Sequence, residues 1–245
     1  MIKKCILLSV AGLLSIQAHS YSKLPAPVVR KLEAMDSVKK LNCDEFEGFV
    51  FSKIDYAKLE VKGSFFKDTP VINGSSTICF LDHDFDDTTK PVLSVVERGI
   101  VEGVNFSLSR WGGSGSVGGE YLSPASWNLG CSTDAMTDDV TCYIFQKGFY
   151  IYRSKNGYSV IIGSEHFPQT TSFLRINKDA PIESQFNGVY SNDTSKNILV
   201  KLGSATAVTI RFTKWPNINP LDEVVDMTSF NAAKFMLDRI YENHI

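Results

Sequence analysis

The chain has 245 residues, 43% of them hydrophobic, and its 25 basic and 27 acidic side chains leave a net charge of -2. This length can bury a sizeable core as one large domain or two small ones. No Lys/Arg cluster and no basic stripe with aromatics occurs, which argues against nucleic acid as a partner. No apolar run reaches the about 18 residues of a membrane-spanning helix, so we expect no transmembrane segment.

Residues 1–20 have the pattern of a secretory signal peptide. Lys3 and Lys4 form a positive start, a short apolar stretch follows, and Ala18 and Ser20 precede a natural cleavage point. A membrane anchor is the alternative, but the apolar stretch is too short to span a bilayer. The sequence therefore predicts an exported bacterial protein that is periplasmic or secreted.

The first predicted element after the signal is a helix over residues 25–41, with two prolines near its start. Its apolar residues recur on one helical face. They are Val29, Leu32, Met35, Val38 and Leu41.

From Phe46 the chain changes to short segments rich in Val, Ile, Phe and Ser, separated by Gly, Asp, Asn and Pro. This texture is typical of strands and turns. The predicted strand segments before the middle of the chain are 48–54, 57–63, 76–81, 92–97 and 105–111.

Residues 112–119, GGSGSVGG, place Gly113, Gly115 and Gly118 at the spacing G-x-G-x-x-G. A dinucleotide-binding loop needs a strand before these glycines and a helix after them. The following EYLSPASWNLGC contains Pro124 and is predicted as strand, so we interpret the run as a flexible turn or linker. It predicts a boundary between two parts, 21–115 with a helix and a β region, and 116–245 with a β-sandwich-like domain and a closing helix.

The clearest local prediction is a hairpin over residues 149–163, in which Asn156-Gly157 favours a type I′ turn. Further strands are predicted at 171–176, 197–202 and 207–215. A closing helix over 228–245 shows one apolar face. That face consists of Phe230, Ala233, Leu237, Ile240 and Tyr241.

These elements predict a mainly β fold, an antiparallel β-sandwich or partial barrel with N-terminal and C-terminal helices. Cys43, Cys79, Cys131 and Cys142 remain after the signal, and four cysteines in an exported chain predict two disulfides. Three pairings are possible, and sequence proximity favours Cys43–Cys79 and Cys131–Cys142. Zinc is the disfavoured alternative, since no C-x-x-C spacing occurs.

The stretch LDHDFDDTT places Asp82, Asp84 and Asp86 at alternate positions. Carboxylate oxygens suit calcium, which is the one cofactor that the sequence brings into question. The glycine and glutamate of an EF-hand loop are missing, and a solvated acidic turn after a strand is the alternative interpretation.

Nucleophilic catalysis has no recognisable motif, since no G-x-S-x-G elbow occurs. His166 follows a predicted strand and is the candidate general base, although histidine is also a common turn residue. We assign no catalytic residues. An exported hydrolase that uses His166 or the acidic cluster 82–87 remains the alternative function.

Exposed aromatic residues offer a route to binding. Trp111 flanks the glycine run, Trp127 precedes Cys131, and Trp215 opens the loop WPNINPLDE. Tryptophan is enriched at binding hot spots, but packing in or beside the core is the alternative for each. Trp215, Trp111 and His166 are therefore the candidate binding residues.

The C-terminal half contains several sequence features in a definite order. The segment WNLGCSTDAMTDDVTCYIF is followed by the hairpin, by Arg175 with Asp179 and Pro181, by a strand carrying Arg211, and by a helix that starts at a Phe. Over residues 125–240 this order resembles the invasion-associated locus B-like periplasmic proteins. The resemblance implies an exported bacterial β-sandwich, sometimes linked to host-cell invasion, and it carries over no catalytic residues.

We therefore expect an exported, non-enzymatic binding or interaction protein of the periplasm or cell envelope. Its expected partner is a protein or an envelope component.

Overall fold

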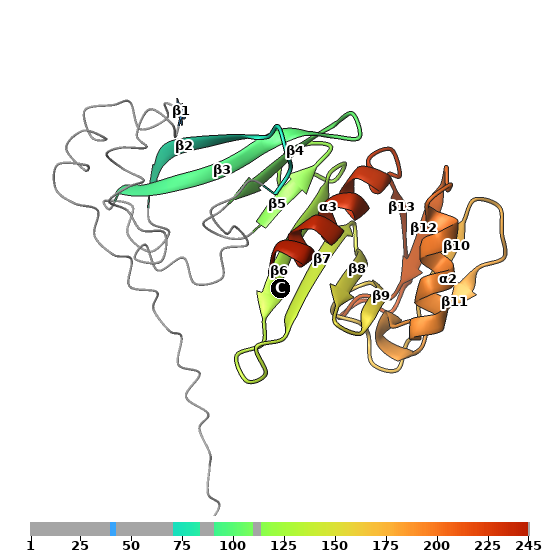
Figure 1. Ribbon diagram of the computed structural model, residues 1–245. Helices are drawn as coiled ribbons and strands as arrows, with labels where there is room; N and C mark the ends of the chain where they lie inside the picture. Colours follow the sequence, from blue (N-terminus) through green and yellow to red (C-terminus); the bar gives the residue numbers. More distant parts are fainter. Residues whose placement is uncertain (1–39, 43–70, 84–90, 110–113, 245) are drawn as a thin grey trace, which may run out of the picture.

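The computed structural model describes residues 40–42, 71–83, 91–109 and 114–244, with side chains over 71–78, 96–109 and 114–243. The described chain is mainly β and forms two antiparallel sheets and two α-helices (Figure 1). This confirms the predicted fold class. The sheets share one hydrophobic core, as in a sandwich, and the described strands of neither sheet close into a barrel.

The larger sheet is an antiparallel meander, in which each described strand pairs with its neighbour in sequence. Its strands are β1 (Lys40–Asn42), β2 (Ser76–His83), β3 (Pro91–Val101), β4 (Val104–Ser109), β5 (Ser114–Val117), β6 (Trp127–Thr133), β7 (Val140–Gln146), β8 (Phe149–Ser154) and β9 (Gly157–Ile162).

The smaller sheet has the order β11-β10-β12-β13. Its strands are β10 (Phe173–Ile176), β11 (Ile182–Glu183), β12 (Val208–Phe212) and β13 (Leu221–Val225). The remaining elements are a 3-10 turn, η3 (Phe186–Gly188), and the helices α2 (Asn192–Leu202) and α3 (Phe230–His244). The predicted strands at 76–81, 92–97, 105–111, 171–176 and 207–215 correspond to β2, β3, β4, β10 and β12.

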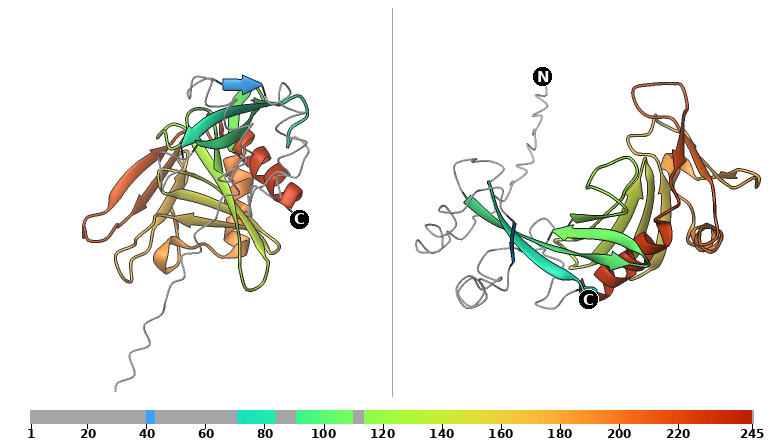
Figure 2. Two further views of the ribbon diagram at one scale, coloured as in Figure 1. Left: turned by 90° about the vertical axis from the view of Figure 1, so that its left-hand side faces the viewer. Right: turned by 90° about the horizontal axis from the view of Figure 1, so that it is seen from above.

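The closing helix is confirmed. Helix α3 lies along one face of the larger sheet, in contact with β5, β6, β7 and β8 (Figure 2). Every residue of its predicted apolar face is at most 5% exposed. Ala232 and Met236 extend this buried stripe, so α3 covers the sheet with a continuous apolar surface.

The strand predicted at 197–202 is wrong, because these residues form the second half of α2. The side chain of Ser191 accepts a hydrogen bond from Thr194 N and caps the helix. Ser195, Ile198, Leu199 and Leu202 are its buried residues, a helical spacing. Taken alone, the apolar run in NILVKL fits a strand, and the cap at Ser191 is what makes it part of a helix.

The N-terminal helix predicted over 25–41 lies outside the described residues, except for Lys40 and Leu41. These two belong to strand β1 and pair with β2, so the helix prediction is wrong there. The predicted strands at 48–54 and 57–63 and the signal peptide at 1–20 also lie outside the described residues.

The hairpin of β8 and β9 is confirmed, but its predicted turn type is wrong. A type I′ turn needs positive φ at both central residues. Gly157 has φ 101°, whereas Asn156 does not have a positive φ. Ser154 pairs with Gly157, so Lys155 and Asn156 form the loop and the glycine closes it.

The interpretation of GGSGSVGG as a flexible linker is wrong for residues 114–117, which form strand β5. This strand pairs with β4 on one side and β6 on the other. The expected boundary between residues 115 and 116 therefore falls inside a strand, and the sheet is continuous across it. Gly115 serves close packing, because a Cβ there would overlap the side chain of Leu108.

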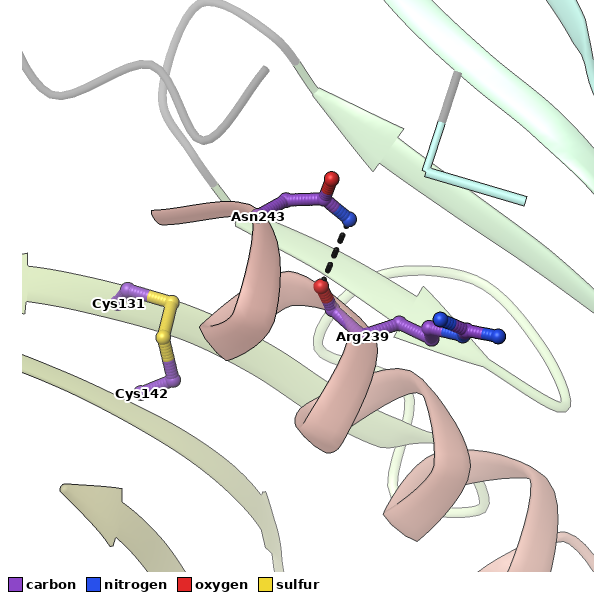
Figure 3. The surroundings of a disulfide bond; sticks show 4 residues. All are labelled: Cys131, Cys142, Arg239 and Asn243. Atoms are coloured by element: carbon purple, nitrogen blue, oxygen red, sulfur yellow. Dashed lines mark hydrogen bonds between the residues drawn. A yellow bond between two sulfur atoms is a disulfide. The ribbon is translucent and has the colours of Figure 1, made fainter. Parts of the chain in front are cut away.

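The predicted disulfide between Cys131 and Cys142 is present and joins directly paired residues of β6 and β7. The last turns of α3, with Arg239 and Asn243, run past it, and Asn243 Nδ2 donates to Arg239 O at 2.8 Å (Figure 3). Of the other predicted pair, Cys43 and the side chain of Cys79 lie outside the described residues.

Glu97 is a fully buried acid with a structural explanation. Its carboxylate accepts hydrogen bonds from Val71 N at 3.0 Å, Ile72 N at 3.2 Å and Ser75 Oγ at 2.5 Å. A buried carboxylate needs such donors. Glu97 therefore fixes the turn that precedes β2.

Candidate functional site

The two faces of the larger sheet differ in chemistry, because successive side chains along a strand point to opposite faces. The face under α3, called the inner face, is apolar. Across β4, β6, β7 and β8 its register aligns Leu108, Leu129, Ile144 and Ile151, which are at most 1% exposed. The opposite side, called the outer face, carries polar and aromatic residues, and we place the candidate site there.

Two rows of paired residues cross the outer face. The first row, from β3 to β8, is Arg98, Ser107, Ser116, Asn128, Phe145 and Tyr150. The second row, from β5 to β8, is Ser114, Gly130, Tyr143 and Tyr152. Along these two rows the outer face is polar over β3–β6 and aromatic over β7 and β8. Val96 and Ile100 add apolar side chains to the same face of β3.

The polar half is hollowed into an open groove of about 1120 Å³. It lies over β3, β4 and β5 and the turn that follows β5. We call it the outer groove. The polar residues that line it include Arg98, Asn105, Ser107, Ser114, Ser116 and Glu120.

The loop between β5 and β6 forms one end of the outer groove and is fixed by side-chain hydrogen bonds. Ser116 Oγ donates to Gly119 O at 2.8 Å, and Ser126 Oγ donates to Glu120 O at 2.6 Å. Leu122 N donates to the Oδ1 atom of the buried Asn128 at 2.6 Å.

This fixed loop presents two apolar side chains to solvent. Tyr121 is 49% exposed and Leu122 is 64% exposed. Large apolar side chains held out on a loop with few alternative conformations are suited to binding, because little ordering entropy is lost when a ligand arrives.

Arg98 has no ion-pair or hydrogen-bond partner for its guanidinium among the described residues, although it is half-buried. The hydroxyls of Ser107 and Ser114 are equally without a partner in the described part of the chain. A guanidinium carries five donors, and each hydroxyl both donates and accepts. The groove therefore offers unused hydrogen-bonding capacity to a ligand rich in oxygen.

Four half-buried rings, Tyr143, Phe145, Tyr150 and Tyr152, form what we call the aromatic cluster. The rings of Phe145 and Tyr150 stack with centroids 5.4 Å apart, and those of Tyr150 and Tyr152 with centroids 6.2 Å apart. Tyr143 contacts Phe145 and Tyr152 at 6.2 and 6.0 Å. The first two pairs are stacked and the last two are tilted, and both arrangements stabilise a packed cluster of rings.

Gly130 connects the groove to the aromatic cluster. It pairs with the groove residue Ser114 on one side and with Tyr143 on the other. A Cβ at Gly130 would lie 2.8 Å from the Tyr143 hydroxyl oxygen, so the tyrosine ring lies down over the glycine. The outer groove and the cluster are therefore parts of one continuous surface.

Burial raises the pKa of Tyr143 and of Tyr152, and the neighbouring tyrosines add to the effect. Both phenols therefore remain protonated well above neutral pH. They can donate a hydrogen bond as well as offer a ring face.

His166 lies in the loop after β9, and a backbone bridge links it to Lys214. Its ring nitrogens are buried and have no hydrogen-bond partner among the described residues. The carboxylate of the adjacent Glu165 forms an ion pair with Lys214 Nζ at 2.8 Å. The hydroxyl of Ser172 donates its hydrogen bond to Ile162 O. The described residues thus assemble no nucleophile and carboxylate around His166.

The three tryptophans have different positions. Trp215 is 57% exposed and its ring lies 5.4 Å from that of Phe167. Trp127 is fully buried and donates from Nε1 to Asp226 O at 3.0 Å, so it packs in the core. Trp111 lies outside the described residues. The exposure of Trp215 leaves its predicted binding role open.

The predicted calcium site lies largely outside the described residues, which do not include Asp84 and Asp86. Asp82 belongs to strand β2, where it pairs with Val92. In the described part of the chain, no group of three or more His, Cys, Asp or Glu residues is placed to hold a metal ion.

A second polar cluster lies where α3 meets the β8–β9 hairpin, on the side away from the outer groove. Tyr158 donates a hydrogen bond to Asp238, and Lys234 Nζ donates to the same carboxylate at 3.0 Å. Burial raises the pKa of Tyr158, and Asp238 contributes in the same direction. Burial lowers the pKa of Lys234, but the hydrogen bonds and charges of Asp238 and Tyr158 together outweigh it, so the net shift is upward. These shifts oppose general-base chemistry at neutral pH.

The outer face was not predicted from the sequence. The sequence does contain a signal for the aromatic part of this face, which is the alternation of side chains in CYIFQKGFYIYRS. This alternation places Tyr143 and Phe145, then Tyr150 and Tyr152, on one side of two adjacent strands. The groove serines have no comparable signal, because serine is common in turns and strands alike.

No protein-family model, no curated protein and no solved structure matches this chain. In the described part of the chain, no helix is both long and apolar enough to cross a membrane.

Proposed function

We propose that this is an exported bacterial binding protein of the periplasm or cell envelope, non-enzymatic, which engages its partner through the outer face. The observation that carries the proposal is the open groove beside a loop fixed by hydrogen bonds, with exposed Tyr121 and Leu122. Concave sites with a few converging polar groups are the usual places for ligands.

Export is supported by the signal-like residues 1–20 and by the Cys131–Cys142 disulfide, since structural disulfides persist in oxidising compartments. The resemblance of residues 125–240 to the invasion-associated locus B-like proteins points the same way. Mass spectrometry of the protein from a periplasmic fraction should find a chain that begins at Tyr21. A cytoplasmic chain that retains residues 1–20 would contradict export.

Photo-crosslinking in living cells of the native host tests the binding face. A photoreactive amino acid is placed at Leu122, and a matched variant carries it at Val200 of α2, which is also exposed. We expect a discrete crosslinked product from position 122 and none from position 200. Identical products from both positions, or none from position 122, would contradict the proposed binding face.

A further inference from the structure

We infer that the ligand of the outer face is an extended glycan chain, bound across the strands from the outer groove to the aromatic cluster. The inference rests on the proposed binding function and names its ligand class. From β3 to β8 the surface crosses five strand spacings, about 24 Å. A ligand that uses all of it must be an elongated chain.

The two halves of the surface match the two chemical characters of a sugar ring. Sugar hydroxyls both donate and accept hydrogen bonds, as the hydroxyls of Ser107 and Ser114 do, and Arg98 adds donors. The apolar C–H face of a sugar ring fits flat against an aromatic face. Tyr143, Tyr150 and Tyr152 supply half-buried aromatic ring surface, and each ring carries a hydroxyl.

Other polymers fit this surface less well. A nucleic acid requires several cations along its path, and the groove lining supplies Arg98 together with the acidic Glu120. A protein partner favours a centre rich in aromatic residues and arginine and depleted in serine. Here serines line the hollow together with Arg98, Ile100 and Tyr121, and the four rings of the aromatic cluster lie beside it and not at its centre. A glycan can use both the outer groove and the aromatic cluster.

Titration calorimetry on the full chain tests the inference with three probes, chitohexaose, cellohexaose and hexagalacturonate. We expect saturable binding of at least one probe at millimolar concentration or below. Tyr150→Ala, which removes a stacking ring, should weaken that binding about tenfold. Phe235→Ala, an exposed ring on α3, is the matched control and should leave the affinity unchanged.

A second variant distinguishes a loss of binding from a loss of folding. Ser107→Tyr fills the outer groove without removing a packing contact, so it should abolish binding at an unchanged melting temperature. Absence of binding to all three probes would overturn the glycan inference. So would equal weakening in Tyr150→Ala and Phe235→Ala.

Failure of this inference can be told apart from failure of the proposed function. If position 122 crosslinks a protein and no probe binds, the binding function stands and the glycan is wrong. If no probe binds and position 122 captures nothing, both are overturned.

Discussion

At Gly188 the chain passes so close to strand β9 that a side chain has no room. This glycine has φ 73°, and a Cβ there would overlap the carbonyl oxygen of Ile162. Positive φ strains other residues, and the overlap adds a displacement of the backbone. We predict that Gly188→Ala lowers the free energy of unfolding by about 3 kcal/mol or more, measured by urea denaturation.

Gly157 provides the matched control. Its φ is 101°, but nothing lies within 4 Å of a Cβ built there. Gly157→Ala should therefore cost only the strain of the backbone, about 1 kcal/mol. Equal losses in the two variants would show that the contact with Ile162 contributes nothing.

For His166, a catalytic role and a structural role predict opposite effects of substitution on the free energy of unfolding. Both ring nitrogens are buried without a partner, and the ring packs against Phe212 with centroids 6.1 Å apart. Unsatisfied buried polar groups cost stability. We predict that His166→Leu keeps or raises the free energy of unfolding, by up to about 1 kcal/mol in urea denaturation. A clear fall in the free energy of unfolding would contradict this prediction.

Between elements, Arg153 joins the β8–β9 hairpin to α3. Its guanidinium lies 4.9 Å from the ring centroid of Tyr158 and 4.8 Å from that of Tyr241, and Nε is 3.9 Å from Asp238. A cation between a half-buried ring, Tyr158, and a buried ring, Tyr241, stabilises more than one over an exposed ring. We predict that Arg153→Ala lowers the free energy of unfolding by about 1–2 kcal/mol.

Arg239→Ala is the control for this contact. Arg239 also lies over a ring, that of Phe235 at 5.4 Å, but it is half exposed and contacts a single ring. Its loss should change the unfolding free energy by less than about 0.5 kcal/mol, because exposed charge contacts contribute little. The result is contradicted if thermal or urea unfolding responds equally to the two substitutions.

The elements that were predictable carry their own local signal. Helix α3 was predictable because its buried face repeats with helical spacing over the whole element, and the β8–β9 hairpin because two apolar runs flank a turn. The strand proposed at 197–202 failed because a short apolar run fits a strand or a buried helix equally well. Ser191, six residues earlier, was the deciding residue.

The candidate site was less predictable, because it is a property of register. Arg98, Ser107 and Ser116 become neighbours only once β3, β4 and β5 pair in the observed register. Nothing within a single strand fixes that register. Strand β5 was missed for a related reason, since glycine and serine favour turns locally and its place in the sheet comes from β4 and β6.

The molecule as a whole should lose stability at alkaline pH. Burial raises the pKa of Tyr143, Tyr152, Tyr158 and, well beyond the ordinary range, Tyr190. A raised folded-state pKa contributes stability that is fully present below the unfolded value of about 10 and is lost as pH rises beyond it. The raised pKa values of Lys214 and Lys234 act in the same direction.

We therefore predict that the free energy of unfolding, measured by urea denaturation, does not change as the pH approaches about 9.5 from below and falls above about pH 10. Tyr152→Phe removes one of the titrating phenols and should give a shallower fall. A level profile through the alkaline range, or a steeper one in the variant, would contradict the assignment.

The meander topology sets an order of events during folding. From β2 to β9 each strand of the larger sheet pairs with its sequence neighbour over a short connection, so this part of the sheet can assemble hairpin by hairpin. The helix that covers its apolar face comes after all of these strands in the chain. Until α3 docks, a growing sheet exposes Leu108, Leu129 and Ile144 to other unfinished chains. Association of unfinished chains is thus a hazard that this architecture carries until α3 covers the apolar face.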